Sequence, residues 1–359
     1  MNDISQDLRN RQALYSFGQS SITSVELSEL DARRIDLKVE PPKPVPIISL
    51  AGQQICTAGN LTVLAAQVKA GKSSVIGAML ATSLQVNTSM TDICDLLGFT
   101  GQPHSGKAVI LFDTEQSEHD AWSLVRRAAK RVGENCLPDN IRCYHLANIS
   151  TPMRRQLLKA ELERAEKVCG GIHCVFIDGV ADLCVDLNDS AEAFGLVETL
   201  VQLASKHNCP IVNVLHENPS GAETGKTRGH LGSQLERKAE SNLRVVKNAK
   251  GVSLIYSDRC RHAAIPKDDG PRFAWNNKAG MHSAVLTDAK ADRADEKRRD
   301  AQREVDAAFA GVVGNIIWSD LKKRVMDCLN VSDKTAQRRI KTWCDLRLIV
   351  ADQKEYRRT

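Results

Sequence analysis

Short apolar runs alternate with longer amphipathic stretches from Ile47 to about Leu286. The apolar runs predict buried strands, and the stretches with an apolar residue every three or four positions predict helices. The predicted strands are Leu61–Ala66, Ala108–Asp113, Ile141–His145, His173–Asp178, Ile211–His216, Asn242–Val246 and Ser253–Ser257. The predicted helices between them are Lys72–Val86, Glu118–Val132, Met153–Cys169 and Ala191–His207. This alternation predicts an α/β domain with a mainly parallel sheet covered by helices.

The segments on either side of this domain have a different pattern. Residues 1–46 are polar and end in the stiff connector PPKPVP, so we expect an N-terminal arm before an α/β domain at 47–286. The run TDAKADRADEKRRDAQREVD has few large apolar side chains and mixed charge. It predicts a solvated helical linker over 287–310, followed by a small terminal unit at 311–359.

Composition places the chain among ordinary globular proteins, with 42% hydrophobic and 26% charged residues. No apolar run is long enough to span a bilayer, and the N-terminal MNDISQDLRNRQ lacks the apolar segment of a signal peptide. The eleven cysteines include no C-x-x-C pair, which favours reduced thiols over a zinc module or a disulfide framework. We therefore expect a cytoplasmic protein without a membrane partner. The net charge of +5 permits nucleic-acid binding without requiring it.

The segment AAQVKAGKSS resembles the phosphate-loop template G-x-x-x-x-G-K-[ST], except that Ala66 stands at the first glycine. Backbone N–H groups of such a loop surround the phosphates, Lys72 supplies charge to the outer phosphates, and the Ser73 hydroxyl ligates Mg²⁺. A chance GKS at a helix start is the alternative, but the strand before it and the helix after it favour a loop for ATP and Mg²⁺. Ala66 is expected to reduce turn freedom. The predicted nucleotide-binding residues are Ala66, Gln67, Val68, Lys69, Ala70, Gly71, Lys72, Ser73 and Ser74.

Two later strands end in carboxylates. The apolar run of HCVFIDG ends at Asp178, as in a Walker B strand, and predicts a second Mg²⁺ contact beside Ser73; a turn or cap residue is the alternative. The strand in VILFDTEQS leads to Glu115, which we predict to be the general base for the attacking water, with helix capping as its alternative role. Asp182 and Asp186 are expected to be solvated loop charges.

The strand IVNVLH ends at His216, a candidate sensor of the γ-phosphate, although a satisfied strand-end histidine is nearly as good an interpretation. The following segment, 217–230, is rich in Gly, Ser, Thr and Asn, and loops this long are usually functional or mobile. Lys226, Arg228 and His230 make it basic, which predicts contact with single-stranded DNA; a merely solvated loop is the alternative.

These motifs occur in the order KAGKS, FDTEQS, IDG and HEN…GKTRGHLGSQLE. The order is similar to that of RepA-like ATPases of the RecA fold, which are common on plasmids, phages and other mobile elements. The resemblance covers about residues 45–280 and implies a homo-oligomer, a hexameric ring or a filament, with ATP between subunits. It further implies basic fingers that reach the neighbour's site, for which Arg259 and Arg261 in YSDRCRH are the candidates. Solvated surface arginines are the alternative.

The terminal unit resembles a winged helix-turn-helix, whose second helix enters the major groove of duplex DNA. Leu321, Val325 and Leu329 lie at helical spacing, the chain breaks at Asn330, and Ser332 is a suitable N-cap. The next helix is expected to pack Ile340, Trp343 and Leu346 inward, and LIVADQKEYRRT is expected to form the wing. An oligomerisation or docking unit is the alternative. The predicted outward, DNA-binding residues are Lys334, Gln337, Arg338 and Lys341.

Taken together, the motifs and the resemblance imply a Mg²⁺-dependent ATPase that acts on DNA. A replicative helicase or helicase-like initiator is the leading expectation. A DNA-bound regulatory or adaptor ATPase, which uses nucleotide state to control assembly without unwinding, is the alternative. A nucleotide kinase is disfavoured because the sequence has no recognisable acceptor-binding lid and such an enzyme would leave the basic tail unexplained.

Overall fold

The structure is a computed structural model. It divides into two compact units, residues 1–44 and 45–359. Among its described residues, the first unit contains the short helix α2 (Ser24–Ala32), followed by turns and irregular backbone. The described residues are 24–84, 95–217, 227, 229–262, 264–285, 289–312, 314–352 and 355–359.

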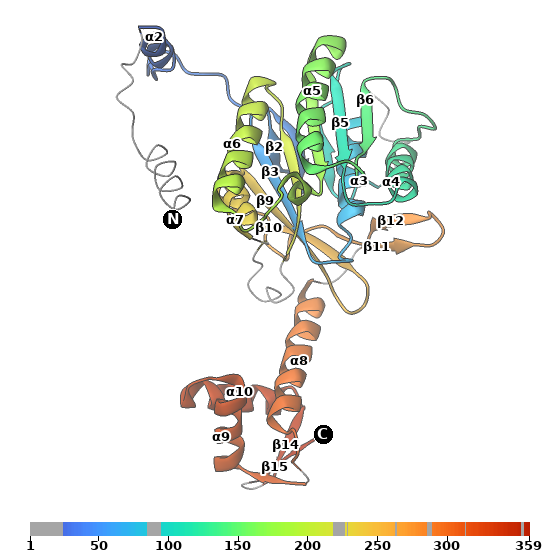
Figure 1. Ribbon diagram of the computed structural model, residues 1–359. Helices are drawn as coiled ribbons and strands as arrows, with labels where there is room; N and C mark the ends of the chain where they lie inside the picture. The colour runs from blue at the N-terminus through green and yellow to red at the C-terminus, as the bar shows by residue number, and fades with distance from the viewer. Residues whose placement is uncertain are drawn as a thin grey trace, which may run out of the picture. The chain divides into compact units, whose positions relative to one another are not determined.

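Within these residues, nine strands form one sheet in the order β12-β11-β10-β9-β3-β8-β7-β5-β6 (Figure 1). The strands from β9 to β6 in this order are parallel to one another, whereas β10, β11 and β12 are antiparallel. Their bounds are β3 (Leu61–Ala66), β5 (Ala108–Asp113), β6 (Ile141–His145), β7 (Ile172–Asp178), β8 (Ile211–His216), β9 (Ser241–Lys247), β10 (Ser253–Cys260), β11 (Arg272–Asn276) and β12 (Met281–Ala284).

The parallel strands are buried because helices cover both faces of the sheet. Every residue of β3, β5 and β7 is buried, which explains why each reads as a continuous apolar run. The mainly parallel α/β sheet predicted from the sequence is confirmed, with strand bounds that differ by at most a few residues. The largest difference is at β10, which extends three residues beyond the predicted Ser253–Ser257.

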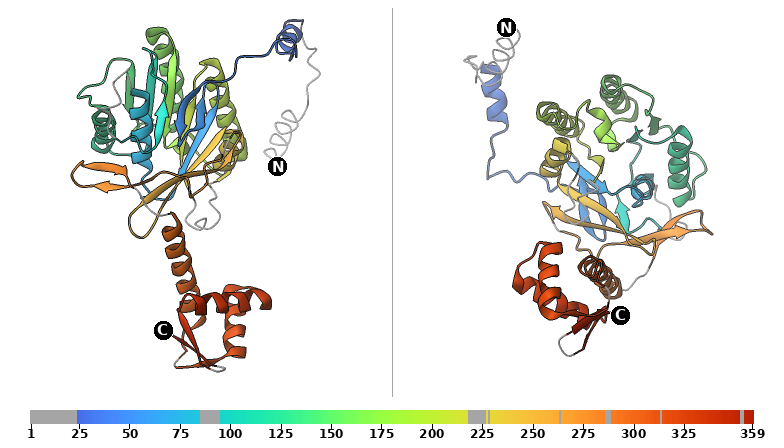
Figure 2. Two further views of the ribbon diagram at one scale, coloured as in Figure 1. Left: turned by 180° about the vertical axis from the view of Figure 1, so that it is seen from behind. Right: turned by 60° about the horizontal axis from the view of Figure 1, so that its bottom comes forward.

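Each face of the sheet has its own hydrophobic core (Figures 1 and 2). On one face lie α3 (Lys72–Leu84), α4 (Glu118–Arg131) and a small antiparallel sheet of the described strands β2 (Gln53–Thr57), β1 (Pro46–Leu50) and β4 (Phe99–Gly101). On the other face lie α5 (Thr151–Cys169), the 3₁₀ turn η1 (Val180–Leu183), α6 (Ser190–Lys206) and α7 (Gly229–Lys238).

Three parts of this domain were not predicted: the small sheet, the β11–β12 hairpin and α7. Helix α7 begins inside the segment interpreted as loop, where two glycines weaken the helical signal. Its apolar residues Leu231 and Leu235 are one turn apart, and both are fully buried against the sheet. The helix therefore forms through tertiary packing rather than through intrinsic propensity.

The terminal unit consists of α8 (Ala289–Ala308), β13 (Ile316–Ile317), α9 (Trp318–Leu329), α10 (Asp333–Asp345), β14 (Ile349–Asp352) and β15 (Glu355–Arg358). Its described strands pair in the order β13-β15-β14. The prediction of a wholly solvated linker helix is wrong for the last turns of α8, because Ala301 and Val305 belong to the core of this unit, with Val305 0% exposed. These two small or branched residues are spaced by four and so line one face of an otherwise charged helix.

The turn between α9 and α10 has the predicted features. Asn330 ends α9 in the left-handed conformation with φ 50°, and Ser332 occupies the N-cap position of α10. Ile340 and Trp343 are buried, and Leu346 packs against the same core. The predicted outward residues Lys334, Gln337, Arg338 and Lys341 are all exposed.

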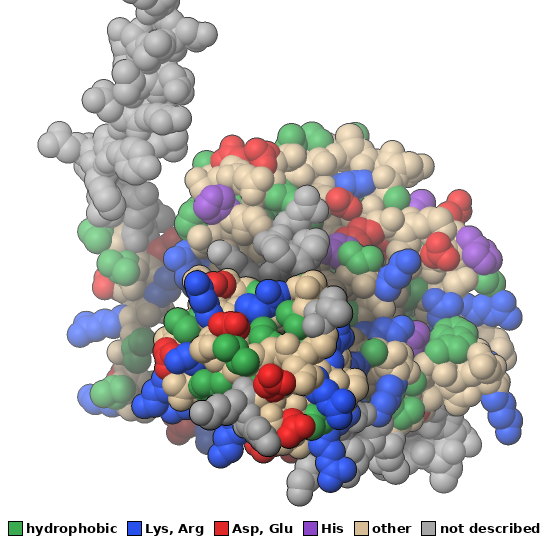
Figure 3. All heavy atoms as spheres, turned by 90° about the horizontal axis from the view of Figure 1, so that it is seen from below, with side chains coloured by type: hydrophobic (Ala, Val, Ile, Leu, Met, Phe, Trp, Pro, Cys, Tyr) green, Lys and Arg blue, Asp and Glu red, His purple; other side chains and the backbone are tan. Residues whose placement is uncertain are grey.

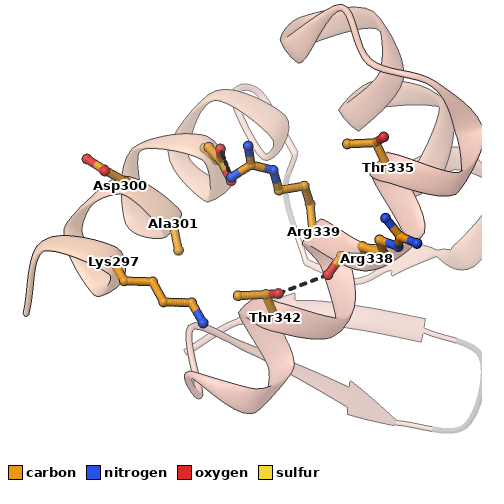
Figure 4. A pocket seen from close by; sticks show the side chains of 8 residues that line it. Lys297, Asp300, Ala301, Thr335, Arg338, Arg339 and Thr342 are labelled. Atoms are coloured by element: carbon orange, nitrogen blue, oxygen red, sulfur yellow. Dashed lines mark hydrogen bonds and ion pairs between the residues drawn. The ribbon is translucent and has the colours of Figure 1, made fainter. Parts of the chain in front are cut away.

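A groove of about 510 Å³ lies between α8 and α10 in this unit (Figure 4). Arg338 lines it, and Arg339 pairs with Glu304 of α8 at 2.6 Å. Lys and Arg side chains are abundant on the face of the molecule that Figure 3 shows. No helix in the described ranges combines the length and the apolar character needed to cross a membrane.

Candidate nucleotide site

The loop after β3 has the conformation of a phosphate loop without its first glycine. Ala66 is the last residue of β3 and pairs with His216 of β8 and Val245 of β9. Within the described loop 66–74, positive φ occurs at Lys69 (64°) and Gly71 (102°), and not at Ala66. The expectation that alanine reduces turn freedom here is therefore wrong, because this position is extended strand that any residue adopts.

Side chains of the antiparallel strands β10, β11 and β12 contact this loop. A Cβ at Gly71 would lie 2.9 Å from the Phe273 ring of β11, so the backbone must approach that ring without a side chain. The Ser253 hydroxyl of β10 donates a hydrogen bond to the Ala70 carbonyl at 2.8 Å. The Ser74 hydroxyl lies 2.7 Å from Nδ1 of His282 of β12. Sequence reasoning missed these three supports, because none of them is near the loop in sequence.

Four predicted residues meet at the carboxyl ends of the parallel strands. Lys72 Nζ, at the start of α3, lies 3.0 Å from Glu115 Oε2 and 3.0 Å from His216 Nε2. It lies 3.7 Å from Asp178 Oδ1. His216 Nε2 is also 3.0 Å from Glu115 Oε2. Because α/β sheets bind ligands at this edge, the cluster has the location of a nucleotide site.

Glu115 is held as a carboxylate. Burial raises its pKa, but the hydrogen bond with His216 and the ion pair with Lys72 outweigh this effect and lower the pKa to about 2. The end of β7 approaches this side chain closely at Gly179, whose φ is 95°. A Cβ on Gly179 would lie 2.3 Å from Thr114 Oγ1 and 2.7 Å from Glu115 Cγ, so only glycine fits.

Asp178 is in the opposite electrostatic situation. Burial raises its pKa, and Lys72 only partly opposes this effect, so that the pKa is about 7. Its Oδ2 accepts a hydrogen bond from Gln116 Nε2 at 3.2 Å, whereas its Oδ1 has no hydrogen-bond partner among the described residues. A buried carboxylate oxygen left in this state fits a cation, and the hard oxygens of Ser73 and Asp178 suit Mg²⁺. These two residues would hold that ion, and the ion would supply charge neutralisation at the phosphates.

Asp113 and Gln116 complete the site, and sequence reasoning did not assign them a role. Asp113 Oδ1 accepts hydrogen bonds from the backbone N–H groups of Glu115 (3.1 Å) and Gln116 (3.0 Å). Gln116 Nε2 donates to both Asp113 Oδ2 (2.6 Å) and Asp178 Oδ2. These bonds fix the turn that presents Glu115. Asp182, expected to be a solvated charge, accepts a hydrogen bond from Thr114 Oγ1 at 2.9 Å instead.

Arg259 and Arg261 lie near the amino-terminal ends of the parallel strands, whereas Lys72 of the same chain lies at their carboxyl ends. The Arg261 backbone N–H donates to the Glu240 carbonyl at 2.8 Å, and its Nη1 lies 3.5 Å from Asn60 Oδ1, just before β3 begins. The six residues of β3 separate this point from the phosphate loop, a distance of about 20 Å. Despite a bulge between Ser257 and Arg259, both guanidinium groups contact the end of α7, at Glu236 and at the Lys238 carbonyl.

The structure places the predicted DNA-contacting residues only in part. His230 is exposed in the first turn of α7, whereas Lys226 and Arg228 lie outside the described residues. Within the segment 217–230, the described residues Glu217 and Thr227 pair as an antiparallel bridge.

The strand, loop and helix, together with the four convergent side chains, define a P-loop nucleotide-binding domain. The chain belongs to the AAA_25 family of AAA domains, whose profile matches residues 23–222, more than half of its length. Membership implies nucleotide binding. Strands β10, β11 and β12 and the terminal unit lie beyond the matched residues.

The chain is also similar to a crystal structure of the RadB recombinase, with 19% sequence identity and a TM-score of 0.43. The match covers 66% of this chain and 95% of that chain. No curated protein matches the chain at a significant level.

Proposed function

We propose that this protein is a Mg²⁺-dependent ATPase that works as a homo-oligomer on DNA. Its proposed role is that of a replicative helicase or helicase-like initiator of a mobile element or replicon. The observation that carries the ATPase proposal is the meeting of Lys72, Glu115, Asp178 and His216 beside a loop with phosphate-binding geometry.

The contacts of Lys72 suggest how binding prepares the chemistry. A γ-phosphate that takes over Lys72 removes one of the two partners that lower the pKa of Glu115. Glu115 then becomes a stronger base than in the nucleotide-free protein, at the moment when a water must be activated. His216 lies within hydrogen-bond distance of both side chains, so it is placed to respond to the same phosphate.

The position of the two arginines supports a shared site. Because they lie at the opposite end of the parallel strands from the phosphate loop of the same chain, we infer that they complete the site of a neighbouring subunit rather than their own. A head-to-tail contact of this kind produces a ring or a filament, and the resemblance to RepA-like ATPases favours a hexameric ring.

Two regions are proposed to contact DNA. The segment 217–230, which follows β8 in the sequence, is proposed to hold a single strand through Lys226, Arg228 and His230. The terminal unit is proposed to be a winged helix-turn-helix that binds duplex through Lys334, Gln337, Arg338 and Lys341. Its order of helix, strand, two helices and a two-stranded hairpin supports that assignment.

A forked-duplex experiment tests this function. The wild-type protein should separate a labelled strand in the presence of ATP and Mg²⁺, and Lys72→Ala protein should not. ATP hydrolysis that DNA stimulates, without strand separation, would instead favour the adaptor ATPase. Absence of ATP hydrolysis in the presence of DNA would overturn the proposal.

A further inference from the structure

Helix α7 runs from the carboxyl ends of the parallel strands, where the candidate nucleotide site lies, to their amino-terminal ends, where Arg259 and Arg261 lie. It begins at Gly229, where the backbone N–H of His230 donates to the Leu187 carbonyl at 3.1 Å, and it ends at Lys238. Its ten residues span about 15 Å. Buried Leu231 and Leu235 fix the helix to the sheet, so its two ends move together.

A line of charged side chains runs along this helix inside the protein. Glu217, the residue after His216, donates its backbone N–H to the carbonyl of Ala66 at 3.0 Å. Its carboxylate Oε1 accepts a hydrogen bond from Arg244 Nη1 at 2.7 Å, and both side chains are almost fully buried, with 3% and 1% exposed. Arg244 lies in the middle of β9, beside Ala65 of β3.

The same guanidinium continues the line toward the other edge. Arg244 Nη2 lies 3.0 Å from Glu236 Oε1 of α7, and the second oxygen of that carboxylate accepts a hydrogen bond from Arg259 Nη1 at 3.0 Å. Glu236 is thus shared between a buried arginine and an exposed one, with exposed fractions of 1% and 57%. A planar guanidinium that bridges two carboxylates fixes their orientation, because its donors have a rigid arrangement.

Burial restricts the geometry of these ion pairs more than it adds to the stability of the protein. A buried ion pair gains little stability over apolar packing, but it tolerates few alternative geometries because any unpaired charge is strongly unfavourable. Glu236 is therefore held between Arg244 and Arg259, and Arg244 is in turn paired with Glu217 beside the phosphate loop.

We propose that Glu217, Arg244 and Glu236 form a relay that positions the Arg259 finger for the neighbouring subunit and links it to the state of the subunit's own nucleotide site. The relay rests on the proposed shared-site ATPase. A shift of the β8 end at His216 and Glu217 would reach Arg259 through three successive ion pairs and the rigid α7. Glu217, Arg244 and Glu236 are positioning residues, which act through Arg259 and not on ATP.

Mixed oligomers test the relay. The reporter subunit carries Arg259→Ala, which leaves its own site intact but removes its finger. The donor carries Lys72→Ala, which inactivates its own site but leaves its fingers intact, so the mixture should regain ATP hydrolysis. Adding Glu236→Gln to the donor should reduce the regained rate about tenfold or more, and adding Glu217→Gln should reduce it several-fold. Because the donor site is already inactive, these losses report only on the finger.

Glu163→Gln in the donor is the matched control, since Glu163 also loses an ion pair, to Lys206 at 3.0 Å, but lies outside the relay. It should regain as much activity as the unmodified donor. In a protein of identical subunits, Glu236→Gln should have no further effect once Arg259→Ala is present. Where Glu236→Gln fails to assemble by light scattering, Glu236→Asp, which keeps the charge but shortens the reach, should give an intermediate rate.

The outcomes separate the two proposals. Full recovery with the Glu236→Gln donor would overturn the relay and leave the shared site standing. Failure of the Lys72→Ala donor itself to restore activity, in mixtures that co-assemble, would overturn the shared site and the relay together.

Discussion

The protein contains two clusters of charged residues that are built on opposite principles. At the nucleotide site, one lysine faces Glu115 and Asp178, and Asp178 keeps a buried oxygen without a hydrogen-bond partner among the described residues. In the relay, two carboxylates alternate with two guanidinium groups, and every carboxylate is paired. The first cluster therefore leaves a carboxylate oxygen for which a ligand could compete, whereas every carboxylate of the second is paired within the protein.

The pKa values reflect this difference. Within the nucleotide site, the pKa of Glu115 is lowered to about 2, and that of Asp178 is raised to about 7, although the two side chains share Lys72. Such divergence between neighbouring carboxylates is typical of functional sites, because each has a different task. Here the ionised Glu115 pairs with Lys72, whereas burial favours the protonated form of Asp178 in the protein alone.

Removing Lys72 from the nucleotide site is expected to have the largest effect on this comparison. Lys72→Ala should abolish ATP hydrolysis, because the outer phosphates lose their charge partner. Glu115→Gln should keep ATP binding but reduce turnover by about 10²–10⁴-fold, since the amide preserves shape without accepting a proton. Nucleotide-binding and steady-state ATPase measurements separate the two effects. Wild-type turnover by Glu115→Gln protein would show that another group is the base.

The next largest effect is expected at the finger edge. Arg261→Ala should lower ATP hydrolysis by about a thousand-fold, the scale seen when an arginine finger is lost. Mixing it with Lys72→Ala protein should restore part of the rate, because each variant keeps a different side of the shared site. ATPase rates over a series of mixing ratios measure this effect. Rates that never exceed the sum of the separate proteins, in mixtures whose subunits exchange, would contradict catalysis between subunits.

The sequence predicted the nucleotide site better than its surroundings, for a physical reason. Lys72, Glu115, Asp178 and His216 each follow a buried apolar run, and parallel strands bring such ends to one edge. The four could therefore be grouped without any knowledge of their contacts.

The supports could not be predicted in this way. Phe273 and His282 contact the phosphate loop from strands about two hundred residues away, and the hydrogen bond that links Ser74 to His282 spans 208 positions. Arg244 was interpreted as part of an ordinary strand because a buried arginine leaves no periodic signal. Its two partners become visible only when β9 and α7 are packed together.

The different electrostatic principles also predict different responses to pH. The pKa of Asp178 is raised from 3.8 to about 7, so between these values the folded state binds one proton more than the unfolded state. Its contribution to the free energy of unfolding therefore falls as pH rises through this window, by about 1.4 kcal/mol per pH unit. From pH 5 to pH 7 this amounts to about 2 kcal/mol in the nucleotide-free protein, because the slope declines as Asp178 ionises in the folded state near pH 7.

Asp178→Asn should remove this slope and, near pH 8, should give a protein that is more stable than the wild type but binds Mg²⁺–ATP more weakly. Urea unfolding of both proteins at a series of pH values is the measurement. A relay substitution such as Glu217→Gln serves as the contrast, because it breaks a buried ion pair and should destabilise the protein instead. Equal pH dependence in wild type and Asp178→Asn would show that Asp178 is not the titrating group.

The smallest effects are expected where charges face solvent rather than a buried partner, as in the terminal unit. Arg338→Ala should weaken binding to a specific duplex site by about 1–3 kcal/mol if Arg338 contacts a base edge. Truncation after Leu286 should remove most duplex affinity while the ATPase domain stays folded.

Lys226→Ala and Arg228→Ala should instead reduce the stimulation of ATP hydrolysis by single strands and leave duplex binding largely unchanged. Fluorescence anisotropy with both kinds of DNA at two salt concentrations distinguishes these effects, because the salt dependence of binding falls when a side chain no longer neutralises a phosphate. Duplex binding that survives truncation would show that the terminal unit is not the duplex-binding unit, and would favour a docking module whose exposed arginines contact a protein partner.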